Sequence, residues 1–170
     1  MAAERNGGTA LCPGSYDPVT FGHLDIIGRA ASVFDQVVVG VVNQPVRKQK
    51  TLFTAEERIG FIEAEVANLP NVQVKPFDTL VVQFAREQGA RAIVKGLRAI
   101  SDFEYEFEMN QLNRKMAPDI ESIYLMAAPQ FSFLSSSGIK ELAMFGGDTS
   151  GLAPDAVAQA LQERLQKEGN

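Results

Sequence analysis

The sequence predicts an α/β fold in which five strands form a parallel, doubly wound sheet with helices on both faces. Short apolar runs alternate with helical patterns along the chain, which is typical of parallel sheets. Val37–Val42 is almost entirely valine, as expected for a strand buried on both faces. The 170 residues suit one core. We therefore expect a disordered tail over residues 1–8 and a single domain over residues 9–167.

Five strands are expected, each a short apolar run bounded by turn-forming residues. They are Thr9–Gly14, Val37–Val42, Val72–Val74, Ala92–Val94 and Ile123–Ala127. The first ends at Pro13 and Gly14, which interrupt regular strand pairing. The last three runs are short, so the sequence marks the centres of these strands better than their ends.

Six helices are expected between and after these strands. They are a helix from Leu24 to Phe34, one opened by Thr54 that continues through Val66, and helices over Val81–Gln88, Phe103–Met116, Ser137–Phe145 and Pro154–Lys167. Apolar residues recur every three or four positions in the first helix. Thr54 and Glu57 have the spacing of a capping box, Gly89 can end the third helix, and Pro118 stops the fourth.

Composition excludes several classes of function. The net charge of −5 argues against a general nucleic-acid binder, so an anionic ligand must be held locally. Cys12 and His23 are the only cysteine and histidine, which excludes an internal disulfide framework and the usual zinc clusters. Cys12 lies within a strand and is interpreted as a small buried apolar residue. Without an apolar leader or a long apolar run, we expect a cytoplasmic protein with no membrane partner.

The segment from Gly14 to His23 is the first candidate site. Ligands of doubly wound sheets bind beyond the carboxyl ends of the strands, where the strand order reverses. Gly14 and Gly22 permit close backbone approach, the following helix N-terminus offers amides, and His23 adds a compact donor. The segment has neither the Walker nor the dinucleotide glycine pattern. A plain turn with a capping histidine is the alternative, but its position favours a phosphate site.

Two further loops follow predicted strands. Lys95 and Arg98 flank Gly96, an arrangement that can hold polyphosphate in an otherwise acidic protein, although a solvated charged loop is the alternative. Ser135, Ser136 and Ser137 stand at a helix start, where they can cap the helix and present hydroxyls to a phosphate. Ordinary capping would explain one serine but not three. Lys140 follows on the first helical turn and is a weaker phosphate candidate.

These segments resemble one enzyme family. Thr20, Gly22 and His23 match the T/H-x-G-H signature of nucleotidyltransferases, and the longer run Pro-Gly-Ser-Tyr-Asp-Pro-Val-Thr-x-Gly-His-x-Asp-Ile is similar to bacterial phosphopantetheine adenylyltransferases. The later Lys-Gly-Leu-Arg, Asp-Phe-Glu-Tyr-Glu and Ser-Ser-Ser stretches agree, so the resemblance covers nearly all of residues 10–165. It implies a Rossmann-like fold. The strand order 3-2-1-4-5 would make the first and fourth strands neighbours at the reversal point.

The resemblance implies transfer of the adenylyl group of ATP to 4′-phosphopantetheine, which gives dephospho-coenzyme A and pyrophosphate in the penultimate step of coenzyme A synthesis. The attacking phosphate is already anionic, so no general base is needed and His23 is assigned to stabilising the transition state. Magnesium is expected on the ATP phosphates rather than in a protein cage. The family also implies a homohexamer, with coenzyme A as a further ligand and no nucleic-acid partner.

The resemblance also assigns residues. The catalytic set is His23, Arg47 and Lys48. The ATP contacts are Ser15, Tyr16, His23, Gly96, Leu97, Arg98, Glu106, Phe131, Ser132, Phe133, Leu134, Ser135, Ser136 and Ser137, and the phosphopantetheine contacts are Ser15, Arg47, Val81 and Lys95. Arg47 stands where relatives usually carry lysine, with Lys48 beside it, so which of the two takes the lysine role stays open. Ser15 replaces the threonine of many relatives and keeps the hydroxyl.

Two alternatives remain at this stage. A nucleotidyltransferase that acts on nicotinamide mononucleotide, or a cytidylyltransferase, would share the first motif but should differ in the Lys-Gly-Leu-Arg and Asp-Phe-Glu-Tyr-Glu stretches. A nucleotide-binding regulatory module of the same fold would bind ATP without releasing pyrophosphate. That module would have no need for His23 surrounded by loop cations.

Overall fold

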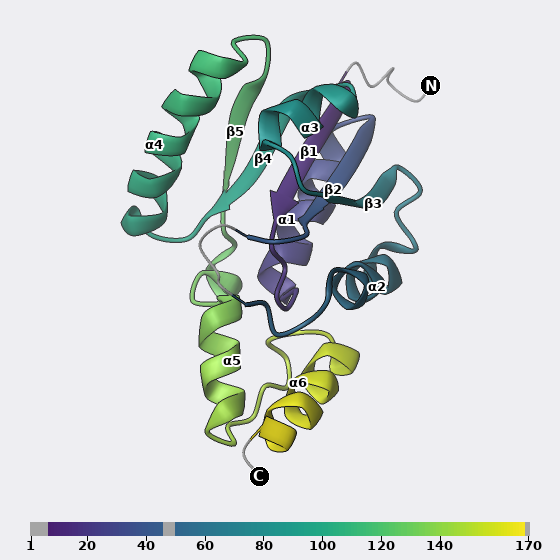
Figure 1. The fold of residues 1–170 in the computed structure, drawn as a ribbon, viewed down its shortest axis with the longest axis vertical. Helices are drawn as coiled ribbons and strands as arrows, with labels where there is room; N and C mark the ends of the chain where they lie inside the picture. The colour runs from purple at the N-terminus through teal and green to yellow at the C-terminus, as the bar shows by residue number, and fades with distance from the viewer. Residues whose placement is uncertain (1–6, 46–49, 169–170) are drawn as a thin grey trace.

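Five parallel strands form one sheet in the computed structural model, which describes residues 7–45 and 50–168 (Figure 1). The strands are β1 (Thr9–Gly14), β2 (Gln36–Val42), β3 (Val72–Phe77), β4 (Ala90–Leu97) and β5 (Glu121–Met126). Their order is β3-β2-β1-β4-β5, and every neighbouring pair is parallel, which confirms the expected topology. β1 therefore lies between β2 and β4, at the point where the strand order reverses.

The expected helices are present, with corrected ends. They are α1 (Phe21–Val33), α2 (Ala55–Val66), α3 (Val81–Glu87), α4 (Ile100–Met116), a 3-10 turn η1 (Pro129–Phe131), α5 (Ser136–Met144) and α6 (Asp155–Glu168). α1 begins three residues before the predicted Leu24, because the Thr20 side chain caps it. α4 begins at Ile100 rather than Phe103, after an N-cap, Ala99, that gives no side-chain signal. In the described ranges no helix is both long enough and apolar enough to cross a membrane.

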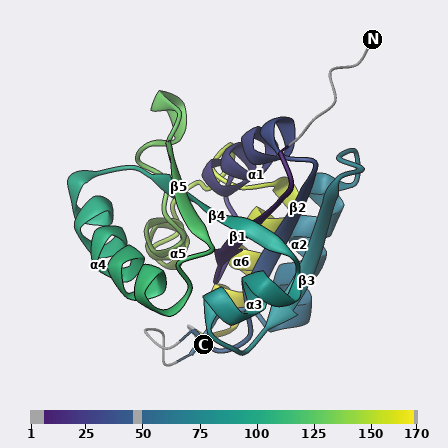
Figure 2. The same ribbon diagram turned by 90° about the horizontal axis from the view of Figure 1, so that it is seen from above.

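Helices cover both faces of the sheet (Figure 2), and an apolar core lies on each face. Ala10 and Cys12 of β1 face the first core, which also contains buried residues of α1, α2 and α6. Leu11, between them, faces the second core with buried residues of α3. This alternation follows from the two-residue period of a strand, and it confirms the prediction of helices on both faces.

The described chain starts next to the sheet. Residues 1–6 lie outside the described part, and only Gly7 and Gly8 of the predicted tail are described. The carbonyl of Gly8 accepts hydrogen bonds from the amides of Asp35 and Gln36, and its own amide donates to the Asp35 carboxylate. Backbone bonding therefore extends one residue before β1.

α4 packs only lightly on the rest of the chain. Its single buried residue is Asn113, and Figure 1 shows the helix beyond β5. Its large apolar side chains are more than two-fifths exposed at Phe103, Phe107, Leu112 and Met116. The apolar residues of this helix are therefore not absorbed by the chain's own core.

Candidate active site

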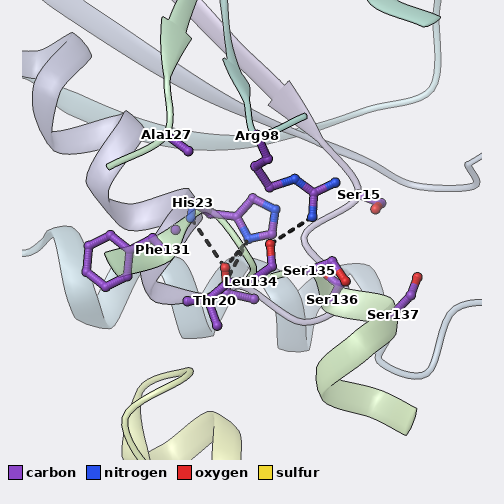
Figure 3. Close-up of a pocket in the computed structure, with 11 residues that line it drawn as sticks. Ser15, Thr20, His23, Arg98, Ala127, Phe131, Leu134, Ser135, Ser136 and Ser137 are labelled. Atoms are coloured by element: carbon purple, nitrogen blue, oxygen red, sulfur yellow. Dashed lines mark hydrogen bonds between the residues drawn. The ribbon is translucent and has the colours of Figure 1, made fainter. Parts of the chain in front are cut away.

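Loops from three strand ends meet in one pocket of about 270 Å³ (Figure 3). They follow β1, β4 and β5, whose carboxyl ends lie at the same edge of the parallel sheet. The pocket is lined by Ser15, Thr20, Gly22, His23, Arg98, Ala127, Phe131, Leu134, Ser135, Ser136 and Ser137. Eight of the fourteen predicted ATP contacts are in this set, so the structure brings more than half of the predicted residues together.

His23 lies inside the first turn of α1, not ahead of it. The hydroxyl of Thr20 accepts from the His23 amide at 3.4 Å, and the Thr20 amide donates to Nδ1 of the imidazole at 3.0 Å. These two bonds form a capping box with histidine at the third helical position. His23 therefore takes part in capping α1, which was the alternative interpretation of the sequence, and it also lines the pocket.

Tyr16 is buried behind His23 and does not line the pocket. Its ring meets the imidazole edge to face at 5.1 Å between centroids, and its hydroxyl donates to the Cys12 carbonyl at 2.9 Å. Burial raises the pKa of the Tyr16 phenol well above its ordinary value. A Cβ on Gly14 would come within 3.0 Å of this ring, so the glycine is needed for the ring to pack there. The structure therefore makes Tyr16 a support for the histidine.

Arg98 joins the loop after β4 to the loop after β5. Its Nη1 donates to the Leu134 carbonyl at 2.7 Å, and its Nε and Nη2 donate to the Asp102 carboxylate at 2.9 and 3.1 Å. Burial alone would raise the pKa of Asp102, but these hydrogen bonds outweigh it and lower the pKa. The guanidinium is thus held at the pocket wall in a defined orientation.

Gly96 and Leu97 do not line the pocket, and Leu97 is buried. A Cβ on Gly96 would lie 2.9 Å from Cγ1 of Ile26 in α1. Gly96 was predicted to contact ATP, between Lys95 and Arg98. The structure adds a packing reason for this glycine, because a larger residue would push α1 away from β4.

Lys95 and Glu106 form an ion pair at 2.9 Å, outside the pocket that contains His23. Both side chains are largely buried, and the pair connects β4 to α4. The Glu106 carbonyl also accepts a hydrogen bond from the Tyr124 hydroxyl at 3.2 Å. Val81 opens α3 and packs against the second core. These predicted contacts for ATP and the acceptor thus lie apart from the His23 pocket in this structure.

The three serines have three different roles. The Ser135 hydroxyl caps α5 by accepting from the Gly138 amide at 3.0 Å, whereas the Ser136 hydroxyl donates to the Pro18 carbonyl at 2.8 Å. Ser137 is exposed at the pocket. Ser132 and Phe133, also predicted, are exposed and do not line the pocket. Capping therefore explains one serine, as the sequence argument expected.

The predicted catalytic residues Arg47 and Lys48 lie outside the described residues. The structure also adds pocket residues that the sequence analysis did not assign to a ligand, namely Thr20, Gly22 and Ala127. Thr20 and Gly22 were visible as parts of the T-x-G-H signature, whereas Ala127 carries no sequence signal. Across residues 7–45 and 50–168, no three His, Cys, Asp or Glu side chains gather into a metal-binding group.

Comparison with known proteins identifies the family. A family model described as cytidylyltransferase-like matches residues 11–142. The phosphopantetheine adenylyltransferase of Rubrobacter xylanophilus is 54% identical over 154 residues, which cover 91% of this chain and 93% of that protein. The protein of the same name from Clostridium tetani is 52% identical over 150 residues, covering 88% and 92%. The chain belongs to the phosphopantetheine adenylyltransferase family.

A solved structure supports the fold of this family member independently. A proposed nicotinate-nucleotide adenylyltransferase from Vibrio parahaemolyticus superposes with a TM-score of 0.64 and covers 95% of this chain and 93% of its own. At 17% sequence identity this likeness concerns the fold alone. The family that the sequence motifs predicted, and its nucleotidyltransferase class, are confirmed.

Proposed function

We propose that this pocket transfers the adenylyl group of ATP to 4′-phosphopantetheine by direct in-line attack. A phosphate oxygen of phosphopantetheine bonds to the α-phosphorus, the bond from the α-phosphorus to the bridging oxygen breaks, and pyrophosphate leaves. The products are dephospho-coenzyme A and pyrophosphate, as membership of the family supports. The observation that supports this proposal most directly is that His23, Arg98 and the N-terminal ends of α1 and α5 converge on one pocket.

Two helix N-termini supply the polyphosphate site in this proposal. Gly22 belongs to the first turn of α1, and Ser135 to Ser137 form the cap and first turn of α5. All of them line the pocket. Amides in the first turn of a helix lack intrahelical partners, and the helix dipole adds partial positive charge. Together with Arg98, they favour an anionic ligand in a protein of net charge −5.

His23 acts in the proposal as a fixed donor to the charge that develops on the transferring phosphorus. The Thr20 amide can only donate, so Nδ1 is the acceptor and the ring proton resides on Nε2. A donor held before the reaction needs no reorganisation when charge develops. The acceptor phosphate is already ionised near neutral pH, so no proton needs to be removed by His23.

Acceptor binding is proposed for Ser15, Lys95 and Val81, together with Arg47 or Lys48. Lys95 forms an ion pair with Glu106, so binding of an acceptor phosphate to Lys95 would exchange one anion for another. Mg²⁺ would accompany ATP, coordinated by phosphate oxygens and water, and would neutralise charge on the triphosphate. A cytoplasmic homohexamer is proposed as well, and the exposed apolar side chains of α4 supply a surface that a second copy would cover.

The test is pyrophosphate release with ATP and magnesium, comparing three acceptors. These are 4′-phosphopantetheine, pantetheine without the phosphate, and nicotinamide mononucleotide. We expect release with phosphopantetheine only. Release with nicotinamide mononucleotide would replace the proposed substrate, and ATP binding without release for any acceptor would point to a regulatory module instead.

A further inference from the structure

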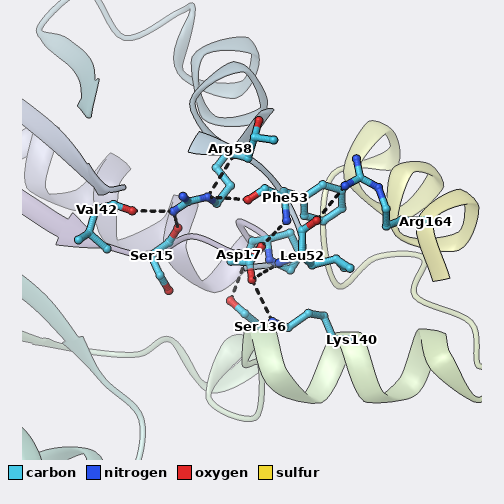
Figure 4. Close-up of polar contacts among 11 residues, drawn as sticks. Ser15, Asp17, Val42, Leu52, Phe53, Arg58, Ser136, Lys140 and Arg164 are labelled. Carbon is cyan, nitrogen blue, oxygen red and sulfur yellow. Dashed lines mark hydrogen bonds and ion pairs between the residues drawn. The ribbon is translucent and has the colours of Figure 1, made fainter. Parts of the chain in front are cut away.

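Asp17 is a fully buried carboxylate in the loop between β1 and α1, and it makes contacts with two distant segments (Figure 4). Its Oδ1 accepts from the Phe53 amide at 2.9 Å, and its Oδ2 accepts from the Leu52 amide and from Nζ of Lys140, both at 3.0 Å. Leu52 and Phe53 precede α2, whereas Lys140 belongs to α5. One side chain therefore binds the first loop to the α2 entry and to α5.

The chemistry of this contact requires a carboxylate. All three partners of Asp17 are donors, and an asparagine would turn its amino group toward at least one of them. Burial alone would raise the pKa of Asp17, but the two amides and Lys140 outweigh it, so the net shift is downward. The side chain is therefore ionised wherever the protein is folded near neutral pH.

Arg58 binds the same two segments as Asp17, the first loop and the α2 entry, but as a donor. Its guanidinium is also fully buried, and within the described part of the chain it donates only to backbone carbonyls, including those of Ser15 at 2.7 Å and Phe53 at 3.2 Å. Phe53 is thus held at its amide by Asp17 and at its carbonyl by Arg58. The two buried charges fix the backbone of the first loop against the α2 entry, which gives the Asp17 contact with α5 a rigid base.

The link from Asp17 to Lys140 runs between two walls of the pocket. Ser15 lines the pocket on the side of the first loop. Ser136, one helical turn before Lys140, lines it on the side of α5. A second link parallels the first, because the Ser136 hydroxyl donates to the Pro18 carbonyl. Lys140 itself does not line the pocket, and its ammonium is directed to Asp17.

We propose that Asp17 and Lys140 are positioning residues that set the separation between the first loop and the start of α5, and hence the fit of the ATP polyphosphate. The proposal rests on the proposed function, since it assigns ATP to this pocket. Lys140 then acts through Asp17 rather than by touching phosphate. Loss of Lys140 loosens one wall of the pocket, while the contacts of Asp17 with the Leu52 and Phe53 amides remain.

The test measures ATP affinity without acceptor by calorimetry, together with kcat and KM for each substrate, in full-length protein. Lys140→Met is expected to raise the Kd and KM for ATP about tenfold, with the KM for phosphopantetheine changed less than about twofold. Lys140→Arg, which keeps the charge, should stay within about threefold of wild type. Arg86→Met, which removes an ion pair to Asp119 away from the pocket, is the matched control.

A double-mutant cycle separates positioning from direct contact. If Asp17 and Lys140 act as one unit, adding Lys140→Met to Asp17→Asn should raise the Kd for ATP by less than about twofold. A full tenfold effect there would mean that Lys140 acts on ATP independently, and unchanged ATP affinity in Lys140→Met with a lowered Tm would reduce the pair to a structural role. Either result overturns the proposal. If Asp17→Asn does not fold, Asp17→Glu takes its place in the cycle, because it keeps the carboxylate but changes the length of the link to Lys140.

The readout also distinguishes this proposal from the proposed function. ATP affinity is measured without turnover, so the comparison of variants remains decisive even if wild-type protein releases no pyrophosphate. In that case the adenylyl-transfer proposal fails, and the calorimetric cycle still decides whether Asp17 and Lys140 position the ATP pocket.

Discussion

The backbone amide of Thr20 donates to Nδ1 of His23 across 3.0 Å, so the residue that begins α1 also selects the tautomer of the imidazole. The proton is left on Nε2, the nitrogen that can donate to a phosphoryl oxygen. The same contact belongs to a capping box, so helix stability and the proposed chemistry share one side chain.

His23→Ala should therefore affect both properties. We expect kcat to fall about 100- to 1000-fold, because a fixed transition-state donor is lost. The free energy of unfolding should also fall by about 1 kcal/mol through loss of the cap. Thr20→Ala is the comparison variant, since it removes the capping hydroxyl and its 3.1 Å contact with Nδ1 but keeps the amide that donates to Nδ1 at 3.0 Å. Steady-state kinetics and denaturant unfolding of both variants check this; equal losses of kcat would show that the cap alone matters.

Lys95→Met tests the separation of the acceptor site from the ATP pocket. The charge that would meet the acceptor phosphate is removed, so the KM for phosphopantetheine should rise about tenfold to a hundredfold. The KM for ATP should change far less, because Lys95 does not line the pocket with His23. Lys115→Met, on the exposed end of α4, controls for the loss of one positive charge. A larger effect on ATP than on the acceptor would contradict the assignment.

Gly96→Ala tests whether that glycine serves packing. The added methyl would meet Ile26 at 2.9 Å, so α1 or Ile26 must shift, and we expect a loss of about 1–3 kcal/mol in the free energy of unfolding. The double variant Gly96→Ala with Ile26→Val should recover part of this loss, because valine lacks the Cδ1 methyl, which lies 3.2 Å from the added Cβ, although it keeps Cγ1. Full stability in the single variant, measured by urea unfolding, would show that the backbone relaxes without cost.

Asp17 should make the free energy of unfolding depend on pH in the acid range. Its folded pKa lies below the ordinary value of about 4, so its ionised form stabilises the fold above that value. The stabilisation is lost as the pH falls through the lower, folded pKa. Asp17→Asn should therefore be less stable than wild type by about 3 kcal/mol near pH 7, with a gap that narrows toward pH 3. A gap that is constant between pH 7 and pH 3 would exclude this linkage.

Patterns in the sequence predicted the strands, the helices and the three loops that meet at the pocket, because periodicity and strand ends are local properties. The strand order came with the resemblance to a known family, since no local pattern encodes which strands are neighbours. The start of α1 was placed three residues late, since the apolar period begins at Leu24 while the cap, Thr20, lies ahead of it. Asp17 and Arg58 were missed as structural residues. Their partners are mostly backbone groups far along the chain, such as Leu52 for Asp17 and Ser15 for Arg58, and no residue spacing encodes such contacts.

Cys12 lies in the middle of β1, where it is almost completely shielded from solvent, and burial raises the pKa of its thiol to about 12. It is the only cysteine of the chain. The proposed acceptor carries a thiol at the far end of its pantetheine arm, and thiol–disulfide exchange requires an accessible thiolate. The protein can therefore handle a thiol substrate under oxidising conditions without becoming trapped as a mixed disulfide with it.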